Sequence, residues 1–74
     1  MTLDYTGQGR RPSARQIVAD WAKGGCPDRF EVCYGETFAE FEYSAHRWQY
    51  FGNGCRGVDR NAVVAALRAR GGGG

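Results

Sequence analysis

Apolar residues recur at helical spacing after the first dozen residues of the chain. Ser13 stands where a helix N-cap is expected, and Gln16, three positions later, completes a capping box in which the two residues cap each other. The glycine pair at 24–25 and the following Cys26-Pro27 predict the end of this helix. Between these signals the apolar positions form one stripe that a helix would bury: Ala14, Ile17, Val18, Trp21 and Ala22.

From Asp28 onward apolar and polar residues alternate, as they do in strands that bury one face. The alternation predicts three strands, at 29–34, 37–43 and 46–51. Gly35-Glu36, between the first two, matches a two-residue hairpin loop of type II′. Ser44-Ala45, between the last two, is a weaker turn sequence. Together these signals predict a three-stranded antiparallel meander.

The two loops imply a strand register, and the register sorts the side chains onto two faces. Phe30 should lie opposite Phe41, and Phe41 opposite Trp48 if the second loop is centred on Ser44-Ala45. The expected core face carries Phe30, Val32, Tyr34, Ala39, Phe41, Trp48 and Tyr50. The opposite face carries three rows: Arg29, Glu42 and Arg47; Glu31, Glu40 and Gln49; Cys33, Phe38 and Phe51.

A second helix is predicted near the C-terminal end. Asp59 is its N-cap, and Val58 is placed to pack against Val63. The resulting order, helix, three strands, helix, is a small α+β fold whose sheet is packed by two helices. We expect one domain at 13–70, a flexible N-terminal arm at 1–12 and a disordered glycine tail at 71–74. The residues expected on the buried side of the second helix are Ala62, Val63, Ala66, Leu67 and Ala69.

Composition narrows the class of protein. The chain has 74 residues and a net charge of +2, which by itself is too small to imply a nucleic-acid partner. No apolar run approaches the ~20 residues that span a bilayer, and the N-terminus lacks a secretory pattern. We therefore expect a cytoplasmic protein without membrane association. Three cysteines, an odd number, favour reduced thiols, with one bridge from Cys26 to Cys33 or Cys55 as the alternative.

Catalytic and metal chemistry are not indicated. Structural zinc sites draw paired ligands from a tight knuckle such as C-x2-C, which this chain lacks. Ser44 and His46 are not part of a nucleophile-elbow sequence, and Gly7-Gln8-Gly9 is not followed by the G-K-[ST] of a phosphate loop. We therefore expect no enzyme and no cofactor. The residues of metal-binding type set aside here are Cys26, Cys33, His46 and Cys55.

Two phenylalanines stand out on the face opposite the expected core. The inferred register sets Phe38 beside Phe51, next to carboxylates of the same face. An apolar patch rimmed by charge is a common form of protein-docking site; the alternative is that a helix or the N-terminal arm covers it. We therefore expect a small non-enzymatic regulator that docks on a larger protein or complex, in the manner of inhibitors and adaptors encoded by phages and other mobile elements. Its candidate docking residues are Phe38, Phe51, Glu31, Glu40 and Glu42.

An arginine-containing arm beside a helix supports a second hypothesis, a small nucleic-acid-binding regulator. Carboxylates on the sheet argue against it, because they would repel a phosphate backbone. Pairing of two copies through an edge of the sheet is a further alternative. The contacts expected for nucleic acid are Arg10, Arg11, Arg15, Arg60 and Arg68.

Overall fold

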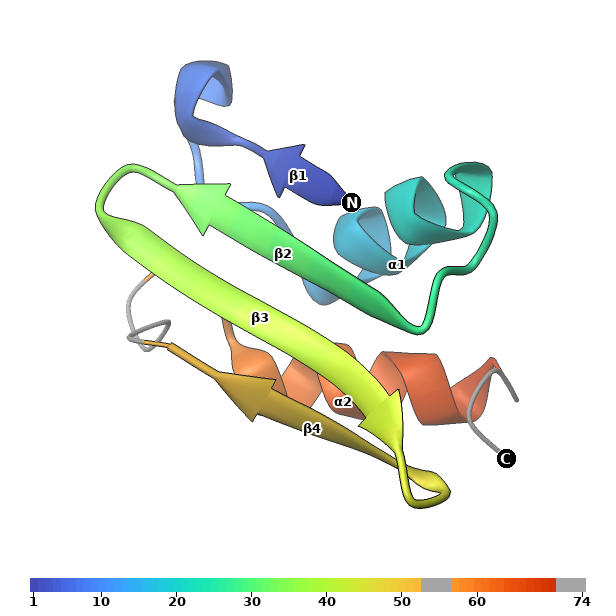
Figure 1. Ribbon diagram of the computed structural model, residues 1–74. Coiled ribbons are helices and arrows are strands. Elements are labelled where there is room, and N and C mark those ends of the chain that lie inside the picture. The colour runs from blue at the N-terminus through green and yellow to red at the C-terminus, as the bar shows by residue number, and fades with distance from the viewer. Residues whose placement is uncertain (53–56, 71–74) are drawn as a thin grey trace.

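The computed structural model describes residues 1–52 and 57–70, which form one sheet backed by two helices (Figure 1). The α+β class expected from the sequence is confirmed. The disorder expected for the tail at 71–74 and the environment of Cys55 lie outside the described residues. The elements in chain order are β1 (Thr2–Asp4), the 3-10 turn η1 (Thr6–Gln8), α1 (Ala14–Lys23), β2 (Arg29–Tyr34), β3 (Thr37–Ser44), β4 (Arg47–Phe51) and α2 (Arg60–Ala69).

The sheet has four strands, where the sequence predicted three. Its order is β1-β2-β3-β4, and β1 runs parallel to β2 with Leu3 paired to Val32. The Tyr5 N–H extends this pairing by donating to the Cys33 carbonyl oxygen at 2.8 Å. Residues 1–12, expected to be a flexible arm outside the domain, therefore supply the first strand of the sheet.

Tyr5, directly after β1, connects this strand to α1. Its side chain is 7% exposed, and its hydroxyl donates to the Asp20 carboxylate at 2.7 Å. Burial and the adjacent Asp20 raise the pKa of Tyr5 well above its usual range. Residues 2–5 alternate polar and apolar side chains, the period of a strand that buries one face, and this short pattern accounts for β1.

The first hairpin has the predicted register. Phe30 pairs with Phe41 across β2 and β3, and Tyr34 pairs with Thr37 next to the turn. Gly35 has a φ of 60°, as the first residue of a type II′ turn requires. Glycine reaches this conformation without steric cost, which is why the signal in the sequence was reliable.

The second hairpin is displaced by two residues from its prediction. Phe41 pairs with Tyr50 instead of Trp48. The turn is Ala45-His46, and both residues are left-handed, with φ of 53° and 63°. Such turns usually contain Asn or Gly, so this pair gave no turn signal. Because the displacement is even, every side chain of β4 keeps its predicted face.

Both helices begin at their predicted caps. The Ser13 hydroxyl accepts from the Gln16 N–H at 3.0 Å, and the Asp59 carboxylate accepts from the Ala62 N–H at 3.0 Å. The reciprocal half of the predicted capping box does not form. The Gln16 side-chain amide donates instead to the Gln8 side chain at 3.0 Å, which ties α1 to the preceding turn.

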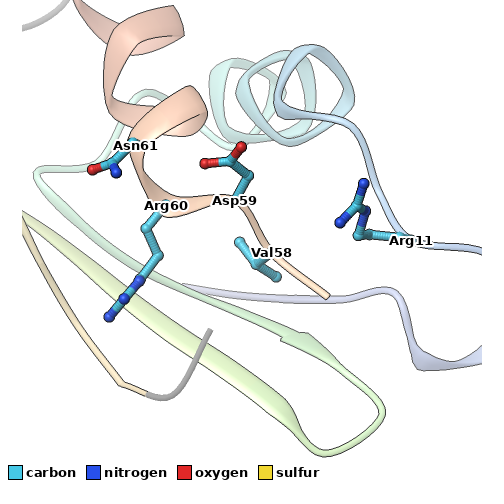
Figure 2. Close-up of a pocket in the computed structure, with 5 residues that line it drawn as sticks. All are labelled: Arg11, Val58, Asp59, Arg60 and Asn61. Carbon is cyan, nitrogen blue, oxygen red and sulfur yellow. The ribbon is translucent and has the colours of Figure 1, made fainter. Parts of the chain in front are cut away.

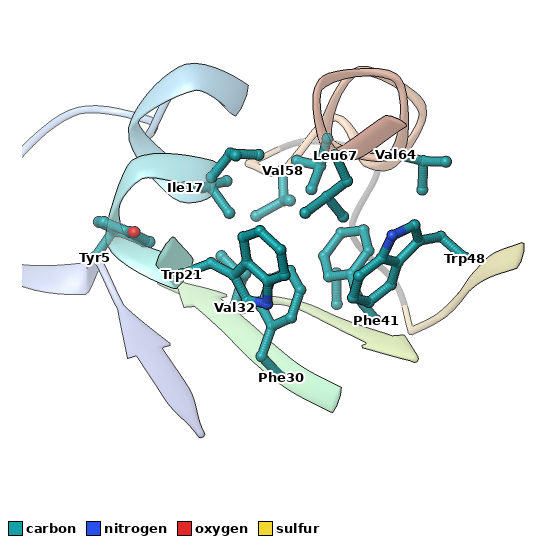
Figure 3. Packing of buried hydrophobic residues seen from close by; sticks show 13 residues of the cluster. Tyr5, Ile17, Trp21, Phe30, Val32, Phe41, Trp48, Val58, Val64 and Leu67 are labelled. Carbon is teal, nitrogen blue, oxygen red and sulfur yellow. The ribbon is translucent and has the colours of Figure 1, made fainter. Parts of the chain in front are cut away.

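Helix α2 turns a slightly different side inward than the sequence pattern predicted. Val63 and Leu67 are buried as expected, whereas Ala69 is exposed. Val64, absent from the predicted set, is buried and lies beside Trp48 at the β4 end of the core (Figure 3). The apolar side of α2 therefore reaches the last strand of the sheet.

Both helices lie on the same side of the sheet, and the core fills the space between them and the strands (Figures 1 and 3). The Phe30 and Phe41 rings stack with centroids 5.0 Å apart, and Trp21 meets Trp48 edge-on at 5.8 Å. This aromatic cluster gives a short chain large buried surfaces. The buried core residues are Tyr5, Ile17, Val18, Trp21, Phe30, Val32, Ala39, Phe41, Trp48, Val58, Val63, Val64 and Leu67.

Candidate docking face

One face of the sheet, here called the outer face, has no helix over it in the described part of the chain. Both α1 and α2 pack on the opposite side, and β1 lies beside β2 within the sheet instead of crossing over it (Figure 1). The alternative in which a helix or the N-terminal segment covers the phenylalanines is therefore not what the structure contains. The outer-face positions are Thr2, Asp4, Arg29, Glu31, Cys33, Phe38, Glu40, Glu42, Ser44, Arg47, Gln49 and Phe51.

Phe38 and Phe51 are the exposed aromatic residues of the outer face. Phe38 on β3 is 38% exposed and Phe51 on β4 is 50% exposed. Phe38 pairs with Cys33 across the ladder, while Phe51 pairs with Glu40. The two phenylalanines are therefore diagonal neighbours, not the adjacent pair that the sequence predicted. The two-residue displacement of β4 causes this difference.

Three glutamates and one arginine form a charged group next to these rings. Arg29 pairs with Glu42 in the ladder, but its guanidinium reaches Glu40 instead, with a nitrogen–oxygen distance of 2.7 Å. The hydrogen bond to Glu40 and its charge raise the pKa of Arg29, and Glu42 and Glu31 add to this effect. Glu31 directly faces Glu40, and like charges in that position repel. Arg29 thus offsets part of the repulsion within an acidic group.

Asp4 adds a carboxylate that the sequence prediction missed. The register of β1 places it beside Cys33 on the outer face, and the signal was the alternation at 2–5. Hydrogen bonds from Thr6 lower the pKa of Asp4, so the carboxylate is charged at neutral pH. Burial, followed by the charges of Asp4 and Glu31, raises the pKa of the Cys33 thiol and keeps it protonated. With Asp4 included, the outer face carries four carboxylates and two arginines.

The arginines of the nucleic-acid hypothesis are spread over several hollows of the surface. Arg11 lines a hollow of about 260 Å³ with the first turn of α2 (Figure 2). Arg60 belongs to that turn but points away from Arg11, toward β4. Its guanidinium lies 4.7 Å from the centre of the Tyr50 ring, and it donates to the Gly52 carbonyl oxygen at 2.9 Å. Arg60 is therefore engaged on the sheet.

The remaining arginines of this hypothesis lie on α1, on α2 or shortly before α1. Arg10 and Arg11 line a hollow of about 320 Å³ with polar residues at the start of α1. Arg15 on α1 lines a more apolar hollow of about 400 Å³ together with Arg70, past the end of α2. Arg68 is exposed near the end of α2. The structure thus brings together Arg10 with Arg11, and Arg15 with Arg70.

The residues of metal-binding type come from separate elements. Cys26 is exposed after α1, and Cys33 is half-buried near the end of β2; both are free thiols. His46 lies in the turn between β3 and β4, although the sequence predicts it as the first residue of a strand. Within residues 1–52 and 57–70, no three His, Cys, Asp or Glu side chains are arranged to hold a metal ion.

No known protein family matches the chain, and no curated protein or solved structure matches it. In the described part of the chain, neither helix combines the length and apolar character needed to cross a bilayer. Function is therefore inferred from the geometry of the outer face and from the placement of the arginines.

Proposed function

We propose that this protein is a small, non-enzymatic, cytoplasmic regulator that docks on a larger protein through the outer face of its sheet. One observation carries the proposal: a sheet face that no helix of the described residues covers presents Phe38 and Phe51 to solvent beside a group of carboxylates. Exposed aromatic residues rimmed by charge are typical of the centres of protein interfaces. An inhibitor or adaptor of the kind that phages and mobile elements encode would work in this way.

The charges of the outer face specify the chemistry of the partner. Glu31, Glu42 and Asp4 lie on the same face to one side of the aromatic pair, and Arg29 is held by Glu40. A complementary partner surface carries Lys or Arg around an apolar pocket that receives the Phe51 ring. Charge complementarity of this kind raises the association rate and makes it sensitive to salt, while the buried rings account for most of the affinity.

The test is capture of partner proteins by immobilised wild-type protein and by variants, from nuclease-treated lysate of the source cell. Phe38→Ser with Phe51→Ser should lose the captured protein, since the rings are exposed and their removal leaves the core intact. Arg10→Ala with Arg11→Ala is the matched control on the helix side and should retain it. Far-UV circular dichroism verifies that each variant is folded. Equal capture by the phenylalanine variant and the wild type would refute docking through this face.

A second test measures the electrostatic part once a captured partner is purified. Glu31→Lys with Glu42→Lys should lower the association rate constant by an order of magnitude or more at low salt, and the difference should shrink in high salt. Glu36→Lys, in the turn between β2 and β3, lies outside the outer face and is the charge-matched control for the single variant Glu31→Lys. An identical loss from the Glu36 variant would show that net charge alone is responsible.

The pairing of Arg10 with Arg11 at the start of α1 favours nucleic acid as a second candidate ligand. Such binding weakens steeply with salt, because the protein's cations displace counterions from the phosphates. Titration of a mixed-sequence oligonucleotide at several salt concentrations checks this, with Arg10→Ala and Arg11→Ala expected to reduce the salt slope. A flat salt dependence, or unchanged binding by the double variant, would exclude it.

A further inference from the structure

Strand β4 forms one edge of the sheet. Its sequence neighbour β3 is its partner, and α2 lies behind the sheet (Figure 1). The strand contains Trp, Tyr and Phe, which favour extended structure, and no proline or lysine to block pairing. The opposite edge, β1, is three residues long. The longer and more apolar edge is therefore β4.

The hydrogen-bond pattern of the sheet shows which backbone groups of β4 face outward. The Tyr43 N–H donates to the Asp28 carbonyl oxygen at 2.7 Å, so the odd positions of β3 face β2. Since hydrogen bonding alternates along an antiparallel strand, the even positions of β3 face β4. Their partners are Arg47, Gln49 and Phe51. The N–H and C=O groups of Trp48 and Tyr50 then point away from the sheet, and no backbone hydrogen bond within the described residues reaches them.

We propose that β4 pairs with β4 of a second copy of this chain, antiparallel, about a two-fold axis at Gln49. In this register Trp48 of one copy lies opposite the partner's Tyr50, and the reverse pair follows by symmetry. Each of these pairs consists of two residues with outward-facing backbone groups, so each exchanges two hydrogen bonds. The pairing joins two four-stranded sheets into one of eight strands.

In the same register, the side chains that β4 carries on the outer face of the sheet complement those of the second copy. Arg47 of one copy lies opposite the partner's Phe51, where a guanidinium can cover an aromatic ring. Within its own chain Phe51 pairs with Glu40, so Arg47 also approaches the acidic group of the other copy. This match between the basic end of β4 and the acidic, aromatic end of the same strand favours a second copy as the occupant of the edge.

The register can be tested by cysteine cross-linking in a Cys26→Ser, Cys33→Ser, Cys55→Ser background. In Gln49→Cys the two new cysteines face each other across the axis with Cα atoms about 4.5 Å apart, within the range that a disulfide bridges. In Arg47→Cys they lie about 13 Å apart, because each is two residues from the axis. Position 47 is more exposed than position 49, so random collisions would cross-link the Arg47 variant faster. Preferential cross-linking of Gln49→Cys under mild oxidation is the expected result.

Sedimentation equilibrium of the native chain gives the independent measurement. The mass should rise from 8.2 kDa toward twice that value with increasing concentration. Arg47→Glu should abolish the rise, because it sets a carboxylate against the partner's acidic group. Adding Phe51→Lys should restore it through an opposite-charge pair. A monomer at all concentrations up to the order of 1 mM, or a dimer without preferential cross-linking at position 49, overturns the proposal. These readouts use no docking partner, and Phe38→Ser alone separates them from the test of the outer face, because Phe38 lies on β3 and not on the edge strand.

Discussion

Two buried tryptophans share one aromatic cluster but differ in the partner of the indole nitrogen. Trp21 is 2% exposed, and its N–H donates to the Pro27 carbonyl oxygen at 2.8 Å. Trp48 is 5% exposed, and its N–H is buried without a hydrogen-bond partner among residues 1–52 and 57–70. The two rings touch, and both contact Phe30. Replacing either by phenylalanine removes the same atoms from a similar apolar environment, while a hydrogen bond is lost only at position 21.

The difference between the two variants can be estimated from these contacts. The packing loss is similar at both sites and largely cancels in the comparison. Trp21→Phe also loses a hydrogen bond with a net contribution of about 1 kcal/mol. Trp48→Phe removes an unsatisfied buried donor, which relieves a desolvation penalty of about 1–3 kcal/mol. Trp21→Phe should therefore lower the free energy of unfolding by at least about 2 kcal/mol more than Trp48→Phe does.

Urea denaturation followed by far-UV circular dichroism measures both variants with the same probe, independent of the tryptophan that was removed. For a domain of this size a 2 kcal/mol difference separates the melting temperatures by roughly 10 °C. The m-values should be unchanged, which verifies that each unfolding is two-state. Equal losses, or a greater loss for Trp48→Phe, would contradict the assignment of Trp48 as an unpaired donor.

Three further predictions address the turns and the N-terminal strand. Gly52→Ala should destabilise the fold by about 2 kcal/mol or more, because the residue has a φ of 110° and the added Cβ would lie 2.5 Å from a β3 carbonyl oxygen. Gly35→Ala, whose Cβ would have no atom within 4 Å, should lower the free energy of unfolding by about 1 kcal/mol. Equal losses for the two variants in urea denaturation would show that the contact at position 52 is relieved by movement of its neighbours. Replacing Ala45-His46 by Asn-Gly should stabilise the second hairpin by about 1–2 kcal/mol, seen as a higher urea midpoint; no gain would mean that the left-handed conformations are not strained. The pKa of Tyr5 is raised in the folded state, so the contribution of its phenol to the free energy of unfolding is complete below pH about 10 and is lost above it as the unfolded chain ionises. In thermal melts from pH 8 to 11, the melting temperature of Tyr5→Phe should therefore fall less steeply with pH than that of the wild type. Identical declines of the two melting temperatures would contradict this.

The strands that were predicted correctly had both a period and a turn residue to mark them. Residues 29–34 alternate and are followed by Gly35, so the strand, its register and its faces followed from local chemistry. Ala45-His46 adopts a glycine-like turn without glycine, and the register of β4 was consequently displaced. β1 is three residues long, too short for its alternation to stand out, and it becomes a strand by pairing with β2.

The candidate docking face was predicted in its composition but not in its arrangement. Strand alternation assigned Phe38 and Phe51 to the face away from the core. Whether a helix covers that face depends on the direction in which each loop carries the chain, which no local pattern encodes. The side-chain conformations of Arg29, which bonds to Glu40, and of Arg60, which points toward β4, likewise depend on the folded backbone. The local sequence does not predict them.

The parallel pairing of β1 has a consequence for the order in which the sheet forms and opens. Strands β2, β3 and β4 each pair with the strand next to them in the sequence, whereas β1 pairs with β2 across the intervening α1, so that Thr2 lies opposite Glu31. Contacts between distant residues form late in folding, since the loop between them must first be closed. We expect β1 to detach more readily than the other strands, because it is held by a short ladder and by the bond from Tyr5 to Asp20. Its detachment would expose the backbone edge of β2, to which a strand of another chain could then add.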